Sequence, residues 1–200
     1  MVLRTLLGCA PFVACGLISV FTRWQIGTVI ALALSLMLLL DDRRRGNTLG
    51  EAIIEVSAAV FCAIAMIISF VAPEAPLREF IAALSAGWQA LTAWLSLVLR
   101  RPFTLGPQLR SVPRPHWPRH PLYRWHLRAS VIWAAAFTAT AIVLGLVESS
   151  MTDSEGIQSV IEVIGYLVPA LAVLRYEMTQ RRTGVVPARG DATATRPAVQ

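Results

Sequence analysis

The stretch "AIIEVSAAVFCAIAMIISFVA", residues 52–72, decides the fold, because its twenty-one residues carry a single charged side chain, Glu55. A helix of about twenty apolar residues crosses the roughly 30 Å hydrocarbon core of a membrane. The whole chain agrees: 56% of its 200 residues are hydrophobic and 15% are charged, whereas soluble domains carry about 25% charged residues. The mean hydropathy is +0.60. The sequence therefore predicts an all-α integral membrane protein.

Working outward from this stretch, five more apolar runs are long enough to cross a membrane. The first two are joined almost without a loop, and Arg23 falls between them. An arginine at mid-membrane costs at least about 3 kcal/mol, so a tight turn should place Arg23 and Trp24 at the interface. The six predicted spans cover residues 5–22, 24–40, 52–72, 80–99, 129–147 and 157–174.

The arginines predict the direction of these spans. All eighteen basic residues are arginine, and cytoplasmic loops collect positive charge. With six spans and a cytoplasmic N-terminus, sixteen of the eighteen arginines lie inside, and only Arg23 and Arg78 lie outside. Without the fourth span, one arginine-rich segment would lie outside. We therefore expect three helical hairpins with both termini cytoplasmic, a membrane domain over 1–182, and a disordered cytoplasmic tail over 183–200.

The segment 100–128, "RRPFTLGPQLRSVPRPHWPRHPLYRWHLR", is a strongly basic cytoplasmic loop. It holds seven arginines, three histidines, six prolines and no acid. The prolines predict an irregular segment on the inner membrane surface, with Trp117, Tyr123 and Trp125 at headgroup level. Its charge either sets topology alone or also contacts an anionic lipid headgroup or phosphate. The candidate contacts are Arg100, Arg101, Arg110, Arg114, Arg119, Arg124 and Arg128.

Neither a metal site nor a cofactor is predicted. His116, His120 and His126 lie among arginines, and the loop has no carboxylate to support a ligating imidazole. The three cysteines lie inside spans without metal-ligand spacing and read as small hydrophobic residues. A loop tethered between two spans is also poorly placed to bind nucleic acid, which we exclude as a partner.

Four polar residues inside the predicted spans are candidates for an intramembrane site: Glu55, Gln89, Gln158 and Glu162. An ionisable group within a span is a functional hypothesis by default. Helical spacing groups them with other small and polar residues on single faces, which should turn away from lipid. Such stripes either hold helices together by hydrogen bonds or line a path for a solute or protons. The sequence leaves both interpretations open.

The loop also carries a resemblance. The run "RRPFTLG", residues 100–106, is followed by a basic aromatic loop and by "VIWAAAF", residues 131–137. Together they resemble a family of uncharacterised bacterial multi-pass membrane proteins marked by an arginine-proline-phenylalanine-threonine-leucine run. The chain departs from that pattern at Gly106 and Pro107. A fainter similarity is to intracellular septation protein A. The resemblance covers about residues 100–147 and implies a bacterial cytoplasmic (inner) membrane and no established chemistry.

A second run, "RRGNTLG" at residues 44–50, agrees with "RRPFTLG" at five of its seven positions. Both follow an even-numbered span, so topology explains the shared arginines. Whether the shared "TLG" records an internal duplication stays open. Any such repeat would run parallel, since a two-span unit returns the chain to the same face.

The expected function is that of a non-enzymatic cell-envelope or scaffold protein, and the alternative is a small solute- or proton-coupled transporter or channel. No nucleophile–base pair, metal cluster or phosphate-binding loop is visible in the spans. Glu55 and Glu162 are expected near opposite faces, too far apart for one acid–base pair. The expected partners are the lipid bilayer, anionic lipid headgroups, other membrane proteins, and a second copy of the chain.

Overall fold

The computed structural model describes residues 2–46, 52–105, 121–150 and 155–182, and within these ranges the regular structure is entirely helical. The predicted all-α class is therefore confirmed, and each predicted span coincides with one helix. The elements are α1 (Val2–Phe21), α2 (Trp24–Arg44), α3 (Ile53–Val71), η1 (Pro76–Arg78), α4 (Ile81–Val98), α5 (Pro121–Ser150) and α6 (Glu155–Arg182). Five of them, α2 to α6, are long and apolar enough to cross a membrane, and α1 adds a shorter apolar stretch over Leu6–Ser19.

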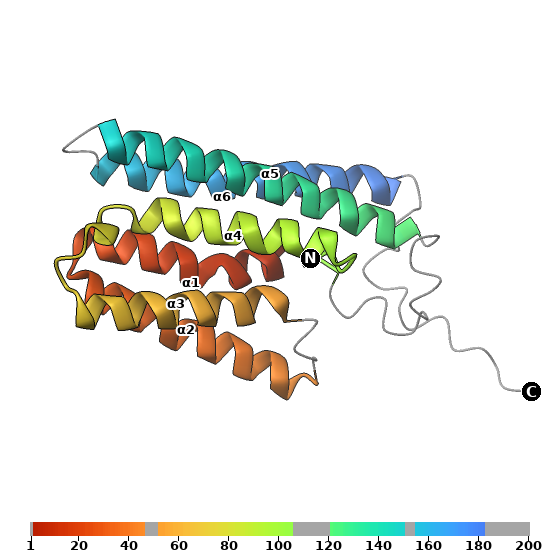
Figure 1. The fold of residues 1–200 in the computed structure, drawn as a ribbon. Helices are drawn as coiled ribbons and strands as arrows, with labels where there is room; N and C mark the ends of the chain where they lie inside the picture. Colours follow the sequence, from red (N-terminus) through yellow and green to blue (C-terminus); the bar gives the residue numbers. More distant parts are fainter. Residues whose placement is uncertain (1, 47–51, 106–120, 151–154, 183–200) are drawn as a thin grey trace, which may run out of the picture.

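The helices run up and down along one common direction, so that α1 begins and α6 ends at the same end of the bundle (Figure 1). Helix α1 lies in the interior, where it packs against α2, α3, α4 and α6. Helix α5 packs against α4 and α6 on the far side of the bundle from α2. The first span in the sequence is thus the helix that most of the others surround.

The distribution of side chains is that of a bundle placed in lipid. Large apolar residues point outward, as in Met37, Phe70 and Val98, which are 65%, 63% and 76% exposed. Small residues fill the contacts between helices, and they include Ala31, Ala58, Ala65, Ala90, Ala93 and Ala129. Lipid tails are as apolar as leucine, so helices associate by close packing of small residues instead. These features make the chain a multi-pass membrane protein.

Two helix boundaries differ from the sequence prediction. Helix α5 begins at Pro121 and not near 129, and α6 continues to Arg182 and not only to 174. Proline is tolerated in the first turn of a helix, where its missing N–H has no partner in any case. The prediction of an irregular segment up to residue 128 is therefore wrong for 121–128, while residues 106–120 lie outside the described part of the chain.

The aromatic residues of this first turn are buried. Tyr123 and Trp125 are only 8% and 4% exposed, so they pack against neighbouring helices and do not lie on the surface of the bundle. The Trp125 ring stacks on Tyr176 of α6, with centroids 6.3 Å apart and an interplanar angle of 4°. Their expected position at headgroup level stays a prediction. Trp117 lies outside the described residues.

The first residues of the "RRPFTLG" run form the C-terminal stop of α4. Arg100 adopts a positive φ of 54°, and the amide of Arg101 donates to the carbonyl oxygen of Ser96 at 2.9 Å. This is the hydrogen bond of a Schellman helix stop, in which a left-handed residue follows the last turn. The amide of Phe103 then donates to Ser96 Oγ at 3.3 Å, so the run folds back against the end of the helix.

The threonine of the same run ties α4 to α5. Thr104 is 5% exposed, and its hydroxyl donates to the carbonyl oxygen of His126 at 3.1 Å. It also lies 2.9 Å from the hydroxyl of Ser130. The run therefore has a structural role as a clasp between consecutive helices. Residues 47–50 of "RRGNTLG" lie outside the described residues, so the question of an internal duplication stays open.

Replacing Thr104 with valine keeps the shape of the side chain and removes the hydroxyl, which leaves Ser130 Oγ without this partner. We expect Thr104→Val to lower the free energy of unfolding by about 1 kcal/mol, measured by thermal unfolding in detergent. Thr22→Val is the matched control, because the exposed Thr22 hydroxyl bonds only to nearby backbone, to Ile18 at 2.7 Å and to Arg23 at 3.4 Å. Equal losses in the two variants would contradict the clasp.

Candidate functional site

Glu162 is the most deeply placed carboxylate of the predicted site. It lies two turns into α6 and is 2% exposed. Its carboxylate lies against Gly16 of α1, where a Cβ atom would come within 2.5 Å of both carboxylate oxygens. Only glycine leaves room for this approach. Among the described residues, Glu162 Oε1 has no hydrogen-bond partner.

One turn further along α6, Tyr166 forms a second polar contact in the interior. The side-chain amide of Gln89, from α4, donates to the hydroxyl of Tyr166 and to the carbonyl oxygen of Ser85 at 3.4 Å. Within the described part of the chain, Gln89 Oε1 has no partner either. Two acceptor oxygens cannot pair with each other, so a proton, a water molecule or a cation has to supply the missing donor.

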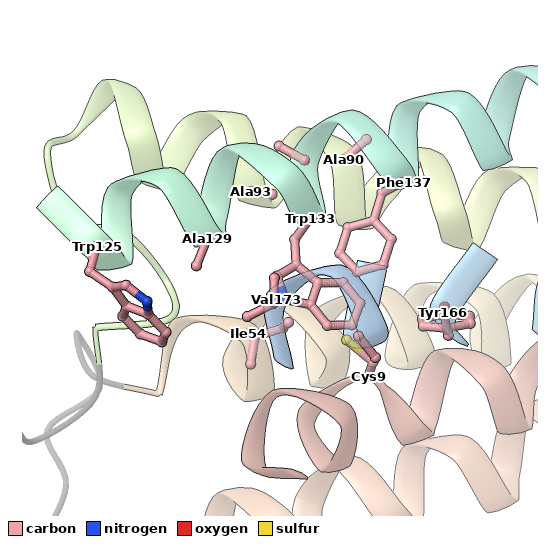
Figure 2. Packing of buried hydrophobic residues seen from close by; sticks show 12 residues of the cluster. Cys9, Ile54, Ala90, Ala93, Trp125, Ala129, Trp133, Phe137, Tyr166 and Val173 are labelled. Carbon is pink, nitrogen blue, oxygen red and sulfur yellow. The ribbon is translucent and has the colours of Figure 1, made fainter. Parts of the chain in front are cut away.

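Towards the first residues of α1, Cys9 joins Tyr166 in one buried cluster. Figure 2 shows the rings of Trp133 and Phe137 extending from α5 toward Cys9. The indole N–H of Trp133 is a buried donor that has no acceptor among the described residues. Most side chains in the centre of the bundle are thus apolar, but several buried polar atoms there have no hydrogen-bond partner among the described residues.

Glu55 lies beyond Cys9 and is 7% exposed. Its Oε1 lies 3.2 Å from the position that a Cβ atom of Gly8 would occupy. The nearest atom to that position is Ile54 Cγ2 at 2.7 Å, so Gly8 allows the start of α3, with Ile54 and Glu55, to approach the surface of α1. The two carboxylates approach the same helix near its opposite ends.

Glu148, at the end of α5, is the fifth ionisable group along this line. It is half-buried, and its Oε1 accepts a hydrogen bond from the amide of Ala83 at 3.4 Å. Its charge is close enough to act on Glu162. Glu162 and Tyr166, Tyr166 and Cys9, and Cys9 and Glu55 are likewise near enough for a charge on one to act on the other. We name this series the α1 file: Glu148, Glu162, Tyr166, Cys9 and Glu55.

Several other polar side chains are paired across helix boundaries, although Ser19 Oγ and Trp125 Nε1 are, like Glu162 Oε1, buried without a partner among the described residues. Thr28 Oγ1 lies 3.1 Å from Ser69 Oγ. Ser57 Oγ lies 2.6 Å from Thr92 Oγ1 and accepts the indole N–H of Trp88 at 2.8 Å. Such hydrogen bonds are typical of the contacts that hold membrane helices together. The packing interpretation applies to them, whereas the unpaired oxygen of Glu162 is different.

The remaining candidates occupy different places. Gln158 lies one turn before Glu162 on α6 and is half-buried. Arg100, Arg101, Arg124 and Arg128 are exposed where α4 ends and α5 begins, and Arg128 Nη1 donates to Tyr176 OH at 3.2 Å. Arg110, Arg114 and Arg119 lie outside the described residues.

Sequence reasoning missed three contributions to the α1 file. Cys9 was taken as a small hydrophobic residue, Glu148 fell just beyond the predicted span 129–147, and nothing was inferred from the glycines of α1. The available signal was the pair Gly8 and Gly16 in a helix that is otherwise apolar. Small residues of this kind mark close approach of membrane helices.

In the ranges that the structure describes, no three His, Cys, Asp or Glu side chains gather in a way that would hold a metal ion. His126 is buried, and its Nδ1 lies 3.3 Å from Thr104 Oγ1. Its place is thus in the clasp between α4 and α5. His116 and His120 lie outside the described residues.

No protein-family model matches the chain, and neither a curated protein nor a solved structure matches it. The resemblance to the bacterial membrane family and to septation protein A stays a prediction from the "RRPFTLG" run. The functional argument therefore rests on the geometry of the α1 file.

Proposed function

We propose that the six helices cross the bacterial cytoplasmic membrane as three hairpins, with both termini in the cytoplasm. The end of the bundle where α1 begins and α6 ends carries exposed arginines on α2, α4, α5 and α6: Arg43, Arg44, Arg100, Arg124, Arg128 and Arg175. The opposite end carries Arg23 and Arg78 together with the exposed acids Glu74 and Glu79. The arginine-rich end is the one that the positive-inside rule places in the cytoplasm.

Reporter fusions test this orientation. A phosphatase that is active only outside the cytoplasm should be active when fused after residues 75 and 152. It should be inactive after residues 47, 112 and 190, because these positions follow arginine-rich segments. Activity at 112 would overturn the six-span arrangement, since that position lies within the most basic segment of the chain.

We also propose that the protein is a non-enzymatic transporter that moves protons along the α1 file, with Glu162 as its central binding group. The observation that carries this proposal is a carboxylate that is 2% exposed and has an unpaired oxygen in the described interior. Thr28 and Ser57, which hold helices together, are hydrogen-bonded instead, and neither carries a group that binds and releases a proton as a carboxylate does. The geometry thus favours the transporter alternative over the envelope or scaffold role.

The file supplies the groups that proton transfer needs. Half-buried Glu148 receives a proton at the outer end and passes it to Glu162. A protonated Glu162 is neutral, which removes the cost of a charge in the bundle, and it gains an O–H that can donate a hydrogen bond. Tyr166 accepts from Gln89 and keeps its own proton to donate. Tyr166 and Cys9 would each take up one proton from the side of Glu162 while releasing their own toward Glu55, which receives the proton near the cytoplasmic end.

Glu162→Gln separates transport from packing. Glutamine keeps the shape and most hydrogen bonds but cannot bind or release a proton, so proton flux into liposomes under an imposed pH gradient should be abolished. The free energy of unfolding should change by at most about 1 kcal/mol, which thermal unfolding in detergent measures. Glu79→Gln, an exposed carboxylate at the same end, is the control and should be silent in both measurements.

Two outcomes of that experiment would contradict the transport proposal. Normal flux in Glu162→Gln would reduce Glu162 to a packing residue. If liposomes that contain the wild-type protein move neither protons nor any of a broad panel of solutes, the result would favour the envelope or scaffold role instead. The bundle suits that second role through its interhelical hydrogen bonds, such as those of Ser57 and Thr28.

Gly16→Ala tests the position of the carboxylate without changing its chemistry. The new methyl group would come within 2.5 Å of the Glu162 oxygens, and the flexible side chain should move aside. We therefore expect a lower proton flux with little loss of thermal stability. Gly145→Ala, where a Cβ atom meets nothing within 4 Å, should leave flux unchanged. Equal flux in both variants would contradict the role of the contact with α1.

A further inference from the structure

A groove of about 480 Å³ lies between the start of α2 and the end of α3. Its long walls are apolar and consist mainly of Ile26, Val29, Ile30 and Phe70. These side chains are 42% to 63% exposed, so the groove opens to the surroundings of the bundle and not to its interior. It is separate from the α1 file, and the inference drawn from it goes beyond the proposed function.

The groove has one polar end. Arg23 and Gln25 lie there, across from Pro73, and the indole N–H of Trp24 donates to the carbonyl oxygen of Pro73 at 3.0 Å. This hydrogen bond holds the start of α2 to the end of α3 and so fixes the mouth of the groove. Arg23 is exposed, and among the described residues no carboxylate pairs with it.

The dimensions of the groove suit part of an extended hydrocarbon chain. Ile30 is seven positions after Arg23, which corresponds to a depth of about 10 Å along the helix. A positive charge at the mouth of an apolar groove is complementary to an amphiphile with an anionic head. A guanidinium also binds phosphate oxygens in a bidentate manner, and the positive end of the α2 dipole adds to the attraction.

We propose that this groove binds an anionic phospholipid, with the phosphate on Arg23 and the upper part of one acyl chain between α2 and α3. The lipid occupies the groove from the outer leaflet in the orientation proposed above. Free phosphate has no apolar part that could pack against the walls of the groove. A water-soluble peptide would have to enter the hydrocarbon layer to reach Ile30 and Phe70.

Lipid binding to the purified full-length protein tests the site by native mass spectrometry. Phosphatidylglycerol and phosphatidylcholine of equal chain length are titrated against wild type, Arg23→Gln, Val29→Trp and the control Arg78→Gln. Wild type should prefer phosphatidylglycerol. Arg23→Gln should weaken phosphatidylglycerol binding about fivefold and leave phosphatidylcholine binding unchanged, while Arg78→Gln should change neither.

Val29→Trp fills the groove and should weaken the binding of both lipids. Thermal unfolding checks that each variant is folded, and Ile26→Phe replaces Val29→Trp if the latter fails that check. Loss of phosphatidylglycerol binding to the same extent in Arg23→Gln and Arg78→Gln would overturn the site, because it would report general surface charge. Complete displacement of phosphatidylglycerol by millimolar inorganic phosphate would overturn it as well, in favour of a phosphate site.

Discussion

The approach of Glu162 to the glycine surface of α1 is the contact on which the chemistry of this bundle depends. Burying a carboxylate among apolar helices costs several kcal/mol unless the group is neutralised or paired. Gly16 removes the steric barrier to that burial, and Gly8 allows the start of α3, with Ile54 and Glu55, to approach α1. Because α1 packs against α2, α3, α4 and α6, any group that reaches its surface is enclosed by several helices. The interior position of α1 and its glycines thus concentrate the ionisable residues in one line.

For the proposed transport, the tight packing around this line favours a proton over a larger solute. Trp133 and Phe137 are 0% and 1% exposed, and Figure 2 shows their rings filling the space beside Cys9. A solute would have to displace these rings. A proton needs only donors and acceptors within reach of one another, with transient water to bridge the gaps. The unpaired atoms of Glu162, Gln89 and Trp133 lie in the part of the bundle where such water would find partners.

The sequence was sufficient to locate the helices, because long apolar runs such as 52–72 have few other stable structures. It was misleading for 121–128, where prolines and arginines concealed a helical turn whose aromatic residues, Tyr123 and Trp125, pack inward. Helical spacing identified Glu162 and Gln89 as members of polar stripes. It did not identify Gly16 as the neighbour of Glu162, because that contact joins residues far apart in the chain and depends on which helix becomes central. Periodicity shows which residues share a face of one helix. Packing decides which other helix that face contacts.

The charges at the two ends of the bundle differ, and this difference bears on how a proton would occupy the file. In the proposed orientation, Glu148 at the outer end lies near a surface where Glu74 and Glu79 balance Arg23 and Arg78, while Glu55 at the inner end lies near a surface rich in arginine. A positive surface lowers the local concentration of protons, whereas a surface of balanced charge has little effect on it. The field does not set the direction of net flux, which follows the electrochemical gradient, but it favours loading at Glu148 and release from Glu55. Anionic lipid bound to the arginines would weaken the field at the inner end, so the same residues that orient the protein would couple proton release to the composition of the inner leaflet.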